Sequence, residues 1–175
     1  MATSTWNIDA SHSLVEFAVK HMMVSTTKGQ FGAVTGVMNI DEADLTNSSV
    51  EATIDVTSIT TRDEKRDAHL RSAEFFDIET YPTMTFKSTS VVRDGDEYKV
   101  HGDLTIRGVT HPVVLEAEFN GIGKSPWGFD VSGFSATTKI DRKDFGLTWS
   151  VALETGGVLV SDTVKIHLEI EGIRQ

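Results

Sequence analysis

The stretch EYKVHGDLTIRGVTHPVVLEAEFN, residues 97–120, carries the clearest structural pattern in the sequence. Its first half alternates polar residues with apolar or small ones up to Arg107, and the second half alternates in the same way from Val113 onward. Successive side chains of a β-strand point to opposite faces, so the alternation predicts two half-buried strands. The Arg107-Gly108-Val109-Thr110 segment between them predicts a tight turn, and the whole stretch predicts a β-hairpin.

The same alternation recurs along most of the chain. It predicts further strands near residues 15–23, 31–40, 50–57, 83–89, 129–140 and 158–170. Together with the hairpin this gives about eight or nine strands, which we expect to be mostly antiparallel because their connections are short. Evenly spaced antiparallel strands close into a barrel or fold as a sandwich, so the sequence predicts an all-β protein.

Residues 62–74 depart from this pattern, because they combine good helix formers with closely spaced opposite charges. Thr61 precedes the run and Glu64 follows three residues later, which is the spacing of a capping box. We therefore predict one short helix, capped by Thr61 and followed by Phe75-Phe76, which we expect to pack over a rim of the barrel.

The composition is that of a globular protein. The 175 residues are 39% hydrophobic and 24% charged, which suits a single domain over residues 1–175. The net charge of −10 argues against nucleic-acid binding and electrostatic membrane docking, although a local basic pocket for one anion is compatible with it. The absence of cysteine excludes disulfides, thiolate catalysis and cysteine-ligated metals. We find no membrane-spanning run and no signal-peptide pattern at the start, so we expect a cytoplasmic protein.

The chain shows no motif for catalysis, a metal or a cofactor. None of its six histidines forms a His-x-His or His-x-x-x-His pair, although histidines distant in sequence can meet in space. His101 and His167 fall on outward strand faces, and His111 is expected in a turn before Pro112. His21 falls on an apolar face, where it is either a core histidine bonded to a carbonyl or hydroxyl group, or a polar anchor inside a cavity.

The inward faces of the predicted strands carry large apolar side chains. Such rows either fill an eight-stranded barrel or line one ligand site. Phenylalanine and methionine adapt well to a long flexible lipid. The candidate ligand-binding residues are Phe17, Val19, His21, Met23, Ile54, Met84, Phe86, Leu104, Ile106, Leu115, Phe119, Ile166 and Leu168.

Arginines gather in the predicted helix. Arg62 and Arg66 are four residues apart and would share one helix face, with Arg71 to one side. The guanidinium group suits a diphosphate, so these three residues are candidates for a lipid headgroup site. Asp63 and Asp67 repeat the same spacing, however, and a solvated face with ion pairs explains the pattern too.

Four motifs appear in order along the chain. They are WNIDASHSLVEFAVKH (6–21), RDAHLRSAEFFD (66–77), GDLTIRGVTHPV (102–113) and RKDFGL (142–147). In these motifs and in their order the chain resembles the YceI-like family of small lipocalin-like barrels, often called polyisoprenoid-binding proteins.

The resemblance implies an extended antiparallel eight-stranded lipocalin-like barrel with one short helix and a long apolar tunnel. It also implies an isoprenoid ligand, such as a polyprenyl diphosphate or a quinone-like lipid, or a fatty amide, and it names no catalytic residue. Many family members are periplasmic and carry a signal peptide, a feature from which this sequence departs. A homodimer is compatible with the pattern. Two alternatives are an enzyme acting on such a lipid, and a ligand-free interaction module with a packed interior and an exposed apolar patch.

Overall fold

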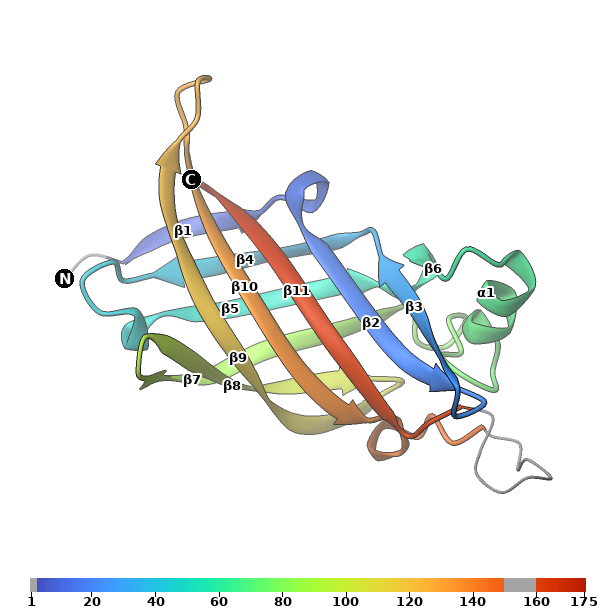
Figure 1. Ribbon diagram of the computed structural model, residues 1–175. Helices are drawn as coiled ribbons and strands as arrows, with labels where there is room; N and C mark the ends of the chain where they lie inside the picture. The colour runs from blue at the N-terminus through green and yellow to red at the C-terminus, as the bar shows by residue number, and fades with distance from the viewer. Residues whose placement is uncertain (1–2, 150–159) are drawn as a thin grey trace.

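The computed structural model describes residues 3–149 and 160–175, and in it one β-sheet closes on itself (Figure 1). The strands are β1 (Ser4–Ile8), β2 (Leu14–His21), β3 (Ser25–Phe31), β4 (Val34–Ile40), β5 (Ser49–Asp55), β6 (Ile59–Thr60), β7 (Thr83–Asp94), β8 (Glu97–Ile106), β9 (Val109–Lys124), β10 (Asp130–Asp141) and β11 (Thr163–Arg174). The α-helix of the described chain is α1 (Glu64–Arg71). Short 3-10 helices span Ala10–His12, Leu45–Asn47, Val56–Ser58 and Arg142–Phe145.

Eight strands form the closed barrel. Their order is β1-β4-β5-β7-β8-β9-β10-β11, and β11 pairs back with β1 to complete the ring. Neighbouring strands run antiparallel throughout. The predicted eight-stranded antiparallel lipocalin-like barrel with one short helix is confirmed.

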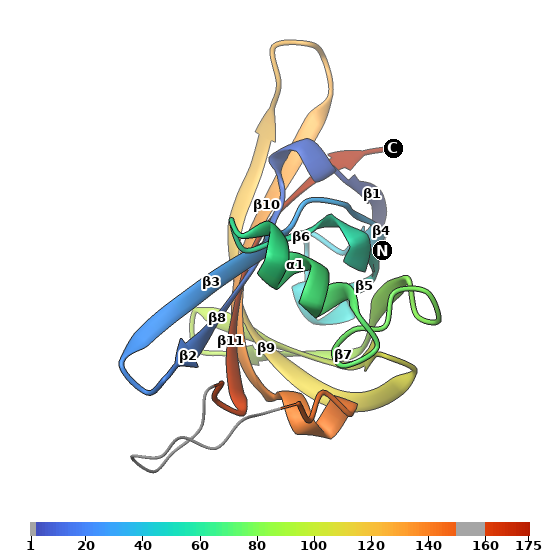
Figure 2. The same cartoon turned by 90° about the vertical axis from the view of Figure 1, so that its right-hand side faces the viewer.

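The other three strands extend the barrel wall at one end. Strands β2, β3 and β6 follow one another beside β11, and β6 forms the edge of the sheet. Both β1 and β2 pair with β11, β1 with residues 172–174 and β2 with residues 165–169, so they act as one bent strand interrupted by a 3-10 helix. Strand β6 pairs with β3 and not with β7, and the segment that carries α1 lies across this end of the barrel (Figure 2).

The bends explain where the predicted strand limits differ from the structure. The strand predicted over residues 31–40 is the end of β3 and all of β4, separated at Gly32-Ala33. The segment 25–31 was not predicted, because STTKGQF has no apolar alternation. Val158, the predicted start of the last strand, lies outside the described residues.

The 97–120 hairpin is confirmed. It turns at Arg107 and Gly108, which both have positive φ (51° and 73°), as favoured two-residue hairpin turns require. Strand β9 begins directly after this turn, so His111 lies within the strand and its placement in a turn was wrong.

The helix forms where it was predicted, but its N-cap is Asp63 and not Thr61. The Asp63 carboxylate accepts hydrogen bonds from the backbone N–H groups of Lys65 and Arg66 at 3.0 and 3.1 Å. Thr61 is buried instead and gives both its backbone N–H and its hydroxyl proton to the buried carboxylate of Asp67. This buried pairing holds Thr61 away from the helix end. Among the described residues, no helix has the length and apolar composition needed to cross a bilayer.

Candidate functional site

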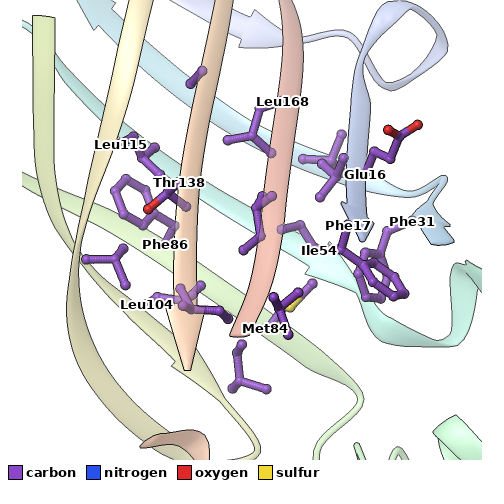
Figure 3. Close-up of a pocket in the computed structure, with 18 of the residues that line it drawn as sticks. Glu16, Phe17, Phe31, Ile54, Met84, Phe86, Leu104, Leu115, Thr138 and Leu168 are labelled. Carbon is purple, nitrogen blue, oxygen red and sulfur yellow. The ribbon is translucent and has the colours of Figure 1, made fainter. Parts of the chain in front are cut away.

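A cavity of about 660 Å³ lies inside the barrel, with walls supplied by strands around the ring and by α1 (Figure 3). Figure 3 shows Leu115, Phe86, Leu104 and Met84 projecting into the same interior space. The volume falls within the roughly 300–1,000 Å³ typical of small-molecule sites. Since a water-sized group occupies about 30 Å³, the cavity has room for at least about 20 carbon atoms. The barrel is therefore hollow, which the sequence pattern alone left open.

Most of the candidate ligand-binding residues line this cavity. Those that do so are Phe17, Val19, His21, Ile54, Met84, Phe86, Leu104, Ile106, Leu115, Phe119, Ile166 and Leu168. They face inward because strand side chains alternate between the two faces of the wall. Their contact with a ligand remains a prediction.

Met23 was assigned to the inward row, and this was wrong. Strand β2 ends at His21, and the chain then turns through Met22 and Met23, which have φ values of 52° and 64°. Met23 is 58% exposed and does not line the cavity. The alternation was continued too far because the sequence contains no glycine, asparagine or proline to mark the turn.

Two glycines keep the interior open beside large aromatic rings. Phe17 pairs across strands with Gly29, and a Cβ atom on Gly29 would lie 2.3 Å from Cζ of Phe17. A Cβ atom on Gly102 would lie 2.3 Å from Cζ of Phe86. Each ring therefore packs over a glycine of the neighbouring strand, where no side chain occupies the space. Aromatic rings packed over glycines in this way stabilise β-sheets. The signal in the sequence for this arrangement is a glycine at an inward position beside an inward phenylalanine on the neighbouring strand.

Charged side chains, most of them basic but including Asp63, line one end of the largely apolar cavity. We call this end, which carries Lys20 and His21 of β2 with Lys65, Arg66 and His69 of the α1 segment, the mouth. Arg66 donates from Nε to the Thr61 hydroxyl at 2.7 Å and from Nη2 to the Thr61 carbonyl at 2.6 Å. These bonds fix the guanidinium group beside the cavity.

The other two arginines of the predicted headgroup site do not join Arg66. Arg62 precedes α1, is exposed and does not line the cavity. Arg71 also lies away from the cavity lining and donates to the backbone carbonyl of Ile59 at 3.1 Å. Arg62 and Arg66 do not share a helix face, because α1 begins at Glu64, two residues after Arg62.

Two histidines lie at the mouth. Within the described part of the chain, the His21 ring has no hydrogen-bond partner, so the carbonyl or hydroxyl partner expected for a core histidine is not found there. The His69 ring packs edge-on against Trp149 with centroids 4.8 Å apart, and its Nε2 lies 2.8 Å from Glu74 Oε2. The sequence placed His69 in the charged cluster of the predicted helix, which was read as either a solvated face or an anionic headgroup site, but only the arginines of that cluster were selected as site residues.

Arg142 stabilises the chain at the same end of the barrel through hydrogen bonds to backbone carbonyls. The residue is 3% exposed, and its guanidinium group donates to four backbone carbonyls, those of Leu147, Trp149, Val160 and Ser161. Burial lowers the pKa of Arg142 from its ordinary value, while nearby Asp162 and Asp141 oppose that shift. Arg142 thereby ties the chain that follows β10 to the chain that leads into β11.

A third polar cluster lies outside the barrel at the bend between β1 and β2. His12 Nδ1 lies 2.9 Å from Asp9 Oδ2 and 3.2 Å from Glu171 Oε2. The hydrogen bond to Asp9, followed by the charge of Glu171, raises the pKa of His12. Hydrogen bonds from His12 and Ser11 lower the pKa of Asp9. The cluster caps the 3-10 helix that separates the two strands.

Comparison with known proteins gives a consistent result. Residues 6–172 match the model of the YceI-like domain. A UPF0312 protein of Staphylococcus epidermidis is 42% identical over 167 residues, which are 95% of this chain and 95% of that protein. The structure of Burkholderia cenocepacia BcnA superposes with a TM-score of 0.80 at 27% identity and covers 94% of this chain and 98% of that one. A polyisoprenoid binding domain from Saccharophagus degradans, implicated in plant cell wall breakdown, has a TM-score of 0.70 at 16% identity and covers 99% of this chain and 100% of that one.

Proposed function

Because the chain belongs to the YceI-like family, we propose that it binds a long-chain polyisoprenoid lipid in the barrel tunnel and carries it. The observation that supports this most is the cavity of about 660 Å³ with its almost wholly apolar lining. The Saccharophagus degradans domain of the same fold is described as polyisoprenoid binding. A binding protein needs no more than these walls, whereas an enzyme would need a reactive polar pair within them.

Burial of the lipid chain would supply most of the affinity. Each CH₂ group taken out of water contributes about 0.8 kcal/mol. Part of this is offset by the lost freedom of the lipid and of the side chains around it. A chain with about 20 carbons inside the tunnel still retains a large surplus, so tight binding requires no charged contact.

The headgroup belongs at the mouth in this proposal. Arg66 and Lys65 line that end of the cavity, and their charged groups would pair with a diphosphate. For a quinone-like lipid or a fatty amide, His21 would donate a hydrogen bond to the carbonyl oxygen. The mouth therefore suits a lipid that enters with its tail first.

The experiment compares two tryptophan substitutions on strand β9. Leu115→Trp places an indole in the tunnel, whereas Val114→Trp places it on the outer face, where Val114 is 38% exposed. We expect prenyl lipids to displace a fluorescent fatty probe from the unmodified protein and from Val114→Trp. Leu115→Trp should bind the probe at least tenfold more weakly with an unchanged far-UV circular dichroism spectrum.

Native mass spectrometry of gently purified protein identifies the lipid. A retained polyisoprenoid supports the proposal. Conversion of an added lipid to a new product would instead indicate an enzyme. Equal probe binding by Leu115→Trp and Val114→Trp would rule out the tunnel as the binding site.

A further inference from the structure

The tip of the β2–β3 hairpin exposes three consecutive apolar side chains. Met22 is 46% exposed, Met23 58% and Val24 85%. Figure 2 shows this hairpin projecting outward at the end of the barrel where α1 lies. Lys20 and His21, which immediately precede the tip, line the mouth of the tunnel. The exposed tip is therefore adjacent to the route by which a ligand reaches the cavity.

Local folding does not favour methionine at this tip. Both Met22 and Met23 have positive φ, and the N–H of Val24 closes the turn by donating to the His21 carbonyl at 3.2 Å. Asn-Gly is the preferred pair for such turns, whereas bulky side chains adopt positive φ at an energetic cost. Met22 and Met23 do not stabilise the turn, so their exposed side chains favour a role in contacting another molecule.

Lysines form a row on the outer face beside this tip. Lys28 of β3 is paired with Ala18 of β2, Ala18 with Lys165 of β11, and Lys165 with Lys139 of β10. Cross-strand partners share a face of the sheet, so these side chains lie side by side on the outer wall. Lys20, two residues beyond Ala18 toward the tip, is exposed as well. We call Lys20, Lys28, Lys139 and Lys165 the lysine row.

Few carboxylates lie near the lysine row, although the chain has a net charge of −10. The sequence has no carboxylate between residues 17 and 40. Within residues 3–149 and 160–175, no member of the row lies within 4.0 Å of a carboxylate oxygen, whereas Lys87 and Lys99 elsewhere on the surface do. At this end of the barrel Asp162 is paired with Lys143 at 3.3 Å. On the same face, the next rung away from the mouth carries Glu16 and the next rung toward the mouth carries Asp141, so the positive surface is confined to the row itself.

We propose that the hairpin tip and the lysine row dock this protein onto an anionic phospholipid bilayer. The side chains of Met22, Met23 and Val24 enter the headgroup region, and the lysines contact the lipid phosphates. The tunnel mouth then faces the membrane surface. The overall negative charge, which argued against docking, is outweighed here because salt screens distant charges over about 10 Å. Lipid exchange through this contact rests on the proposed function, but docking itself does not.

Vesicle flotation of the 175-residue protein tests the proposal. Vesicles of phosphatidylcholine alone are compared with vesicles that also contain phosphatidylglycerol. We expect binding to the anionic vesicles only, and loss of that binding in high salt. The tip variant Met22→Asn/Met23→Gly and the row variant Lys28→Gln/Lys139→Gln/Lys165→Gln should each reduce the partition coefficient at least about tenfold. The tip variant installs the preferred turn sequence, so it should fold at least as stably as the unmodified protein.

Matched controls separate this surface from general adsorption. Lys87→Gln/Lys99→Gln/Lys124→Gln changes the net charge equally, and Trp127→Ser removes an apolar side chain that is 80% exposed on the β9–β10 hairpin. Both controls should float like the unmodified protein. Equal losses in the controls, or no preference for anionic vesicles, would overturn the docking surface.

The tunnel variant Leu115→Trp distinguishes docking from lipid binding. It should lose the fluorescent probe and still float with anionic vesicles. Loss of flotation in this folded variant would mean that vesicle association depends on lipid uptake, and the proposed surface would be wrong. Retained flotation together with retained probe binding would contradict the proposed function and leave docking intact.

Discussion

The ring of Phe17 lies against Gly29 on the neighbouring strand, at a distance that leaves no room for a Cβ atom on the glycine. The ring is held along the wall and does not cross the tunnel. The capacity of the tunnel therefore depends on a residue with no side chain as much as on those that line it.

Gly29→Ala should push the Phe17 ring into the tunnel. The new Cβ would also lie 2.9 Å from Cγ2 of Thr61, so overpacking should lower the free energy of unfolding by about 1–3 kcal/mol. Lipid affinity should fall in a titration with a fluorescent fatty probe. Gly32→Ala is the control, because a Cβ there meets nothing within 4 Å. Adding Phe17→Leu to Gly29→Ala should restore binding, and a failure to do so would show that the ring is not the cause.

Arg66→Ala should weaken binding of a polyprenyl diphosphate and leave the matching alcohol unaffected. A charge-assisted contact contributes about 1.5–3 kcal/mol, which corresponds to roughly a tenfold to hundredfold change in Kd. Arg62→Ala is the control, because Arg62 is exposed and does not line the cavity. Isothermal titration with both lipids measures the difference. If the unmodified protein binds the two lipids equally, Arg66 has no role in headgroup binding.

Arg142→Lys should be strongly destabilising even though it preserves the charge. The guanidinium group serves four backbone carbonyls, whereas an ammonium group has three donors on one atom and a different shape. We expect urea unfolding to show a loss of about 2–4 kcal/mol, since buried carbonyls are left without donors. Lys143→Gln, an exposed neighbour, should change stability by less than about 1 kcal/mol. Comparable effects of the two substitutions would argue against the bracing role of Arg142.

Stability should depend on pH through the cluster at the bend between β1 and β2. The raised pKa of His12 means that its contribution is complete below about pH 6.5 and is lost as the pH rises through the folded-state value. The lowered pKa of Asp9 means that its contribution is present above about pH 3.9 and is lost as the pH falls through the folded-state value. The cluster therefore stabilises most between these limits.

Thermal unfolding at pH 5.5 and pH 8 measures this effect. The difference in Tm between the unmodified protein and His12→Gln should be larger at pH 5.5 and should shrink toward pH 8. His101→Gln on an outer strand face serves as the control. A difference that does not vary with pH would exclude His12 as the titrating group.

The sequence predicted the strands that alternate most regularly and failed where the barrel wall bends. Period-two alternation reports which face of a strand is buried, and it correctly placed Phe86, Leu104 and Leu115 on the cavity wall. It gave no sign of β3, whose exposed residues are polar or small. It also continued past His21 to Met23, because the positive φ values of that turn are imposed by the hairpin and not by turn-forming residues.

The hollow interior could not be predicted from alternation alone. Inward rows of the same residues are compatible with a packed core, and the decision rests on how rings such as Phe17 are oriented by glycines on adjacent strands. The expectation that Arg62 and Arg66 share a helix face was wrong for a different reason. Sequence spacing treats Arg62 and Arg66 as neighbours on one helix, whereas Asp63 caps that helix and leaves Arg62 outside it.

The tunnel also has a consequence for how this protein responds to compression. Voids inside a folded chain disappear on unfolding, so hydrostatic pressure favours the unfolded state in proportion to the void that is lost. Apolar walls hold water poorly, and a tunnel without lipid is therefore a region of low density. Filling it with lipid removes that volume difference. The lipid-loaded barrel should consequently withstand higher pressure than the stripped barrel, and the shift in the midpoint pressure of unfolding reports how much of the tunnel the lipid occupies.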